Sequence, residues 1–182
     1  MKTLSKPLAI AIMAVLIVGS SLFSGIRQVN ALADECNAVF TQGVNGDGLS
    51  IARDLRKRAD CTENIIAIAN TYIDTSDEDV TRALQLADLL RKETDKKKLY
   101  EAHIELQSRV EGILSKLAEN TSYIVNTTHK ETIPEQKSIF DSAYMTIGYD
   151  GYNQKVEEFN RKTDGFVGAF FKLLSKKVQA FE

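Results

Sequence analysis

The sequence is poor in the residues that interrupt helices and in those that recognise nucleic acid. Only two of its 182 residues are proline and ten are glycine, which favours long uninterrupted helices over many turn-linked strands. Tryptophan is absent, and no tyrosine or phenylalanine pattern interleaves with basic residues, so platforms for stacking bases are missing. The net charge of −2 supplies no general attraction to phosphates. We therefore expect no nucleic-acid partner.

Side chains that carry chemistry are also scarce. His103 and His129 are the only histidines, so a metal site with several histidines cannot form. The chain has no Gly-x-Ser-x-Gly, no Ser-x-x-Lys and no glycine-rich phosphate loop. Residues 45–48 resemble the start of a calcium loop, but Gly43 stands where the first ligand is needed. These absences predict no catalytic residue, no metal site and no cofactor, and hence a protein that is not an enzyme.

What is present begins with an apolar run near the N-terminus. Lys2 and Lys6 precede a charge-free stretch from Pro7 to Ile26, which as a helix spans roughly 30 Å, the thickness of a bilayer core. As a transmembrane anchor, it leaves residues 1–6 as a cytoplasmic tip and residues 27–182 as an extracytoplasmic domain, because the positive flank stays in the cytoplasm. The lipid bilayer is therefore an expected partner through Pro7–Ile26.

A cleaved signal peptide is the competing interpretation of the same run. Leu8–Val18 would then be the apolar core, and Ala31-Leu32-Ala33 would place the cleavage after Ala33. That site lies farther from the apolar core than a signal-peptidase site should, which favours the anchor. Both interpretations export the remainder of the chain.

Beyond this run, apolar residues recur at intervals of three and four. The clearest case is a heptad seam with one polar member, formed by Leu99, His103, Leu106, Val110, Ile113, Leu117 and Ile124. Further helices are expected over Ser50–Ile73, from an N-cap at Ser76, over about Glu135–Asp164 after a break at Pro134 and with Gly148 and Gly151 inside, and over Phe166–Val178. An all-α fold follows, in which an N-terminal transmembrane helix precedes an antiparallel bundle of about four long helices.

The two cysteines, Cys36 and Cys61, leave two possibilities open. In an exported protein they could form a disulfide between neighbouring helices. They could equally be small buried residues with free thiols.

Three segments carry a family resemblance. Arg56-Lys57-Arg58-Ala59-Asp60, with Asn64 after it, is similar to an Arg-Arg-Ala-Asp-Leu-Ile-Pro-Asn-Leu segment. Tyr152–Asn160 is similar to a Tyr-Asn-x-x-Val-x-x-Tyr-Asn segment, and Phe181-Glu182 to a terminal Phe-Glu. In this order, behind an apolar helix, they resemble the LemA family of bacterial membrane-attached proteins along nearly the whole chain. Thr62-Glu63 departs from the family's Ile-Pro pair.

The resemblance implies a short cytoplasmic N-terminus, one transmembrane helix and an external helical bundle, and it implies no activity. We expect the motif residues to be structural, with Asn153 and Asn160 bonding to a neighbouring helix and Arg56 pairing with Asp60 on its own helix. The full set is Arg58, Asp60, Asn64, Tyr152, Asn153, Val156, Phe159 and Asn160.

These observations predict a single-pass, non-enzymatic helical-bundle protein of the bacterial cell membrane, with a cytoplasmic N-terminus and the bundle outside. Its expected role is that of an adaptor or scaffold for another membrane or envelope protein. The alternative is a secreted or tethered ligand-binding bundle with a pocket near His103, Tyr144 or Tyr152. Homo-oligomerisation is left open.

Overall fold

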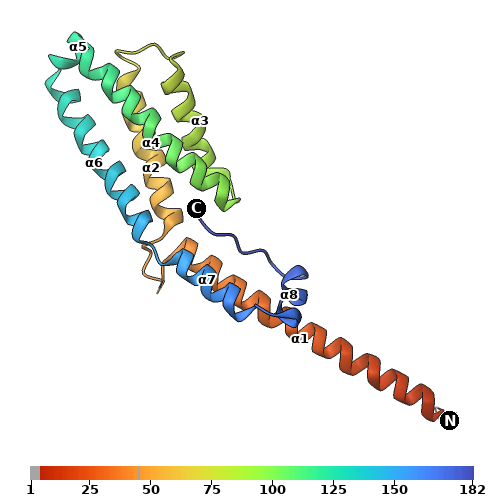
Figure 1. Cartoon of the computed structure of the whole chain (residues 1–182). Coiled ribbons are helices and arrows are strands. Elements are labelled where there is room, and N and C mark those ends of the chain that lie inside the picture. The colour runs from red at the N-terminus through yellow and green to blue at the C-terminus, as the bar shows by residue number, and fades with distance from the viewer. Residues whose placement is uncertain (1–4, 45) are drawn as a thin grey trace. The chain divides into compact units, whose positions relative to one another are not determined.

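The computed structural model describes residues 5–44 and 46–182 (Figure 1). The expectations for Lys2, for most of the cytoplasmic tip and for Asn45 lie outside the described residues. Within them all regular structure is helical and no strand occurs, which confirms the all-α class. The chain forms two compact units: unit 1 contains Met1–Asn37 and Gln154–Val178, and unit 2 contains Ala38–Asn153 and Gln179–Glu182.

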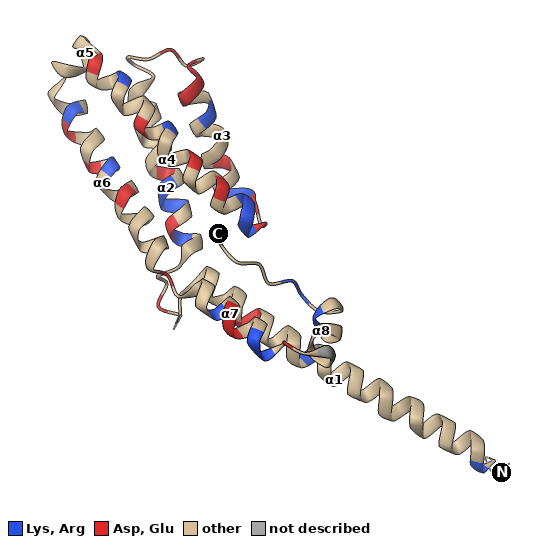
Figure 2. Ribbon diagram, in the orientation of Figure 1, with Lys and Arg blue, Asp and Glu red and all other residues tan. Residues whose placement is uncertain are grey.

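Unit 1 contains most of α1 (Lys6–Gln42), most of α7 (Tyr152–Lys162) and all of α8 (Phe166–Leu173). An 18-residue window of α1 has a mean hydropathy of 2.3, and none of it is buried. By length and composition this helix could cross a membrane, although a signal sequence would pass the same test. Figure 2 shows that charged residues are absent from this part of α1 after Lys6.

A small core holds the rest of unit 1 together. Val29, Ala33 and Cys36 of α1 pack with Phe159 of α7, and three partly buried side chains join them: Leu32, Phe171 and Val178. Lys176 also binds α1: its ammonium pairs with Asp34 at 2.7 Å, and its backbone amide donates to Oδ1 of Asn30.

Unit 2 contains α2 (Ile51–Ala69), α3 (Glu78–Lys92), α4 (Lys96–Glu119), the single turn α5 (Thr121–Ile124) and α6 (Thr127–Tyr149). Helix α2 packs against both α3 and α6, and α3 packs against α4 (Figure 1). The predicted seam of α4 is confirmed, because each of its members from Leu99 to Leu117 is buried. Ile124 is 45% exposed, so the seam ends with α4.

Several helices begin or end at other residues than the sequence pattern predicted. Asn126 caps α6 by accepting from the His129 amide, so α6 begins upstream of Pro134 and includes it. The expected helix over Glu135–Asp164 is in fact two helices. Asp150 has an extended backbone and accepts a hydrogen bond from the Tyr152 amide at 2.8 Å, which ends α6 and starts α7. Gly151 therefore lies at a break between helices.

The remaining predicted ends differ by a few residues. The N-cap of α3 is Asp77, whose carboxylate accepts from the amides of Asp79 and Val80, while the Ser76 hydroxyl donates to Asp74. Helix α2 stops at Ala69, where turns replace the last residues of the predicted Ser50–Ile73 helix. Helix α8 ends at Leu173, and residues 176–182 have no regular structure.

Candidate binding sites

Arg58 is completely buried in the core of unit 2. Its guanidinium lies over the Phe140 ring, 4.0 Å from the centroid, and 5.0 Å from that of Tyr144. Nη1 donates to the carbonyl oxygen of His103 at 2.8 Å and to the ring Nδ1 of the same residue. Nη2 donates to Oε1 of Gln107 at 2.6 Å, while Nε has no hydrogen-bond partner among the described residues. The family-like motif thus supplies a core cation held by neutral acceptors and aromatic rings.

Among the described residues, Arg58 forms no ion pair with a carboxylate, and the Gln107 side-chain amide lies between them. Gln107 accepts from the guanidinium with its oxygen and donates from its nitrogen to Glu111 at 2.7 Å and to Asp141 at 3.4 Å. Burial lowers the pKa of Arg58 to about 10, and the nearby Tyr144, Asp141 and Glu111 oppose this shift. Arg58 therefore remains a cation at neutral pH.

His103 is the neutral partner of this cation. Burial lowers the pKa of His103 to about 3, and the charge of Arg58 lowers it further. Because Nδ1 accepts from Arg58, the ring proton is assigned to Nε2. The ring stacks on Tyr144, with centroids 5.0 Å apart. A neutral imidazole with its basic nitrogen occupied is suited to packing rather than to acid–base work near neutral pH.

Tyr152 and Asn153 bind the final residues of unit 2. The Asn153 side chain donates from Nδ2 to the carbonyl oxygen of Phe181 and accepts from the Phe181 amide at Oδ1, each at 2.9 Å. The Tyr152 hydroxyl donates to the carbonyl oxygen of Gln179 at 2.6 Å. The prediction that Asn153 bonds to a neighbouring helix is wrong, because its partner is an extended segment. We call residues Gln179–Glu182 the tail.

The ring of Phe181 fills an aromatic site beside His103. It is 4% exposed and lies 5.3 Å from Tyr100, 5.8 Å from Phe40 and 5.9 Å from His103, between centroids. Phe40 in turn contacts the Tyr152 ring at 5.1 Å. The tail is therefore part of the same aromatic cluster that contains the stacked His103.

Asp60 and Asn64 lie on the surface of α2 and join it to other helices. Asp60 pairs with Arg91 of α3 at 2.5 Å, and Arg91 also pairs with Glu63. The predicted pair between Arg56 and Asp60 is therefore wrong, because an arginine on the neighbouring helix takes the carboxylate. Asn64 donates to Gln136 of α6 at 3.0 Å.

The other motif residues belong to unit 1. Val156 and Phe159 are buried, as expected for packing positions. Asn160 accepts from Nζ of Lys172 on α8 at 2.5 Å. Asn153 and Asn160 therefore serve different partners in different units, and they do not form the shared stripe that their spacing predicted.

Both cysteines are buried and carry free thiols, so the disulfide that the sequence left open is not formed. The Cys36 thiol donates to the carbonyl oxygen of Lys155 at 3.4 Å within unit 1, whereas Cys61 lies on the buried face of α2 in unit 2. Burial raises the pKa of each thiol. The alternative interpretation, two small buried residues, describes them correctly.

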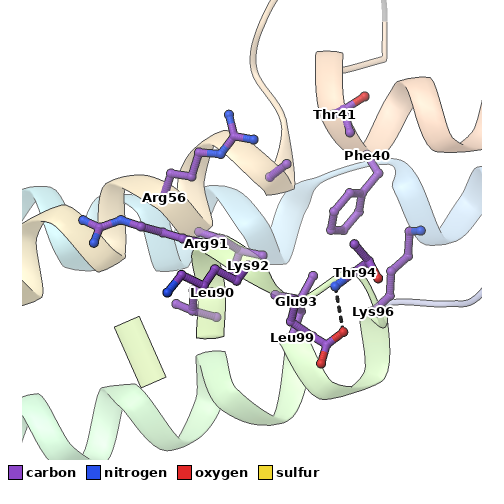
Figure 3. A pocket seen from close by; sticks show the side chains of 12 residues that line it. Phe40, Thr41, Arg56, Leu90, Arg91, Lys92, Glu93, Thr94, Lys96 and Leu99 are labelled. Carbon is purple, nitrogen blue, oxygen red and sulfur yellow. Dashed lines mark hydrogen bonds between the residues drawn. The ribbon is translucent and has the colours of Figure 1, made fainter. Parts of the chain in front are cut away.

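A cavity of about 310 Å³ lies in unit 2 between the last turn of α1, helix α2 and the α3–α4 turn (Figure 3). Phe40, Leu90 and Leu99 form apolar parts of its wall. Figure 3 shows Arg56 and Arg91 on one side and Lys96 beside Phe40 on the other. The Lys96 ammonium lies 4.9 Å from the Phe40 centroid, and Glu93 accepts from the Thr94 amide at 2.7 Å. The lining does not include His103, Tyr144 or Tyr152, near which a pocket was predicted.

Metal-ligating side chains do not converge within the described residues, where no group of three or more histidine, cysteine, aspartate or glutamate residues could hold an ion. In the loop that resembled a calcium site, Asp47 accepts a hydrogen bond from the Leu49 amide at 2.9 Å.

Over residues 5–44 and 46–182 the protein is all-helical, with one apolar helix that could span a membrane. Comparison of the chain with protein-family models, with curated proteins and with solved structures gives no match. A function can therefore be proposed only from the residues described above.

Proposed function

We propose that this chain is a membrane-anchored, non-enzymatic helical-bundle protein of the bacterial cell envelope that acts as an adaptor or scaffold. The observation that carries the proposal is the unburied apolar part of α1. Ile10, Val15 and Phe23 are 67%, 70% and 70% exposed. A continuous apolar surface of this size on a soluble protein would be covered by a partner or a bilayer, and the length of the run fits a bilayer.

The resemblance to the LemA family supports the finer parts of the proposal. It favours an uncleaved anchor at Pro7–Ile26, a cytoplasmic N-terminus and an external domain from residue 27 onward. It also favours an antiparallel bundle built from α2, α3, α4 and α6, and the packing of α2 on α3 and α6 and of α3 on α4 supports this arrangement. The basic residues before the run favour the same orientation.

Fractionation of the full chain from a bacterial host tests the anchor. We expect an intact chain that only detergent extracts. Val15→Arg should shift part of it to the soluble fraction, because a central arginine adds about 2.5–3.5 kcal/mol to insertion. Leu84→Arg, at a 40% exposed position on α3, is the matched control and should leave fractionation unchanged. A soluble chain that starts at Asp34 would contradict the anchor.

Partner capture tests the adaptor role. Cross-linking in intact cells, followed by purification in several mild detergents, should recover the same envelope or membrane protein each time. The absence of a reproducible partner under all these conditions would count against an adaptor.

The cavity favours a second candidate function, the binding of a small organic anion with an apolar body. Its volume is near the lower end of small-molecule sites. Arg91 is paired with acidic residues, whereas Arg56 forms no ion pair among the described residues. Thermal shift with medium-chain carboxylates tests it: the wild type should be stabilised and Arg56→Glu should not. No shift with any of these ligands would remove this candidate.

A further inference from the structure

The tail is bound in the way that receptors bind extended peptides. Tyr152 and Asn153 form three hydrogen bonds with its backbone, which do not depend on the side chains of the tail. One aromatic site takes the Phe181 ring. The Gln179 side chain donates to Asp95 at 3.3 Å and accepts from the Lys96 amide at 3.4 Å. Backbone hydrogen bonds combined with pockets for alternate side chains are a recurring mode of peptide recognition.

The spacing of these contacts defines a sequence preference. Gln179 and Phe181 make specific contacts through their side chains, whereas the half-buried Ala180 between them forms no hydrogen bond among the described residues. A ligand for this site therefore needs an extended Gln-x-Phe segment. The receptor surface lies wholly in unit 2, in which Phe40, Tyr100 and His103 form the aromatic site and Asn153 fixes the backbone.

We propose that unit 2 is a receptor for an extended Gln-x-Phe segment of an envelope partner, and that the tail is its resident competitor. This inference rests on the proposed adaptor function and names the class of partner segment. The tail has an advantage over any free segment, because it is covalently joined to residues 176–178, which are themselves held in unit 1 by the Lys176–Asp34 ion pair and by the packing of Val178. Covalent attachment of this kind gives the tail an effective concentration of at least about 1 mM, which a partner segment must overcome by binding more strongly.

Fluorescence anisotropy on the full chain in detergent tests this proposal. The probe is a labelled, amidated peptide with the sequence of residues 176–182. The chain variant Phe181→Ala should bind it about tenfold or more tightly than the wild type, because the resident competitor has lost its buried ring. A peptide with alanine in place of its phenylalanine should not bind. Equal affinity of wild type and variant, or binding of the alanine peptide, would overturn the proposal.

A second pair of variants separates the site from a general effect on folding. In the Phe181→Ala chain, Asn153→Ala should weaken peptide binding about tenfold, since two hydrogen bonds are lost. Asn160→Ala, the matching asparagine of the motif in unit 1, should leave it unchanged. Equal effects of the two changes would contradict the assigned role of Asn153.

Should the Phe181→Ala chain fail to fold, hydrogen exchange in the wild type tests the same point. The Phe181 amide donates to Asn153, so displacement of the tail by excess peptide should accelerate its exchange in a saturable manner. Unchanged exchange would overturn the proposal. Dimerisation of the full chain in sedimentation that Phe181→Ala abolishes would overturn the proposal, because the site would then bind the tail of a second copy. Because these assays use purified chain, their failure is distinct from a failure to find an envelope partner.

Discussion

Arg58 of α2 donates through one nitrogen to both the carbonyl oxygen and the ring of His103 on α4. This relationship places a cation in the core with neutral acceptors around it. The buried charge is stabilised because the planar guanidinium can donate hydrogen bonds to His103 and Gln107 while it lies on the Phe140 ring.

Arg58→Lys should therefore destabilise the protein more than Arg58→Met. Lysine keeps the buried charge but cannot make the forked contacts, so we expect a loss of about 3 kcal/mol in the free energy of unfolding. Methionine removes the charge and fills similar space, for a loss of about 1 kcal/mol. Denaturant unfolding in detergent measures both. The opposite ranking would mean that the charge itself stabilises the core.

The buried neutral state of His103 should make stability depend on pH. Its pKa is about 3 in the folded chain against 6.5 ordinarily, so between these values the unfolded chain binds the additional proton. Stability is therefore lost as pH falls from about 6.5, by about 3 kcal/mol at pH 4 from this group. His103→Gln keeps an acceptor for Arg58 and cannot titrate. Its unfolding free energy should fall less from pH 7 to pH 4, and a constant offset from wild type would contradict this account.

The N-cap of α3 offers a matched pair of substitutions. Asp77 caps two amides and pairs with Lys116 of α4 at 2.7 Å, so Asp77→Ala should cost about 1–2 kcal/mol. The neighbouring Ser76 bonds only within its own turn, and Ser76→Ala should change stability by less than about 0.5 kcal/mol. Melting temperatures of the two variants decide between Asp77 and Ser76 as the cap.

The thiols of Cys36 and Cys61 should be protected in the folded chain. Burial shields both and raises the pKa of each, which lowers the fraction of reactive thiolate. A thiol reagent should react slowly with the native protein and titrate two thiols per chain after denaturation without reductant. Detection of no free thiol in the denatured chain would instead indicate a disulfide.

The sequence predicts the helices better than their ends. Apolar spacing identified the α4 seam because the seam side chains, three or four positions apart from Leu99 to Leu117, lie on one buried face. The division between α6 and α7 was missed because a single carboxylate, Asp150, makes it, and neighbouring residues keep a helical pattern on both sides. Pro134 was misread because the Asn126 cap starts the helix earlier.

The candidate sites were harder to predict for a related reason. Arg58, Tyr152 and Asn153 stood out from the family-like motifs, but their partners lie far along the chain: Arg58 and His103 are 45 residues apart, and Asn153 and Phe181 are 28 apart. Gln107 carries no local signal, since its role exists only where three helices meet. The cavity likewise depends on the packing of α1, α2 and the α3–α4 turn, which no single segment encodes.

The position of Phe181 also sets an order of events during synthesis. Asn153 is synthesised 28 residues before Phe181, an interval of a few seconds at ordinary elongation rates. Phe40, Tyr100 and His103 are made earlier still, so these residues of unit 2 exist for seconds without the ring that packs against them. The aromatic cluster therefore cannot be completed until residue 181 has been added, and unit 2 cannot reach its final packing before that point.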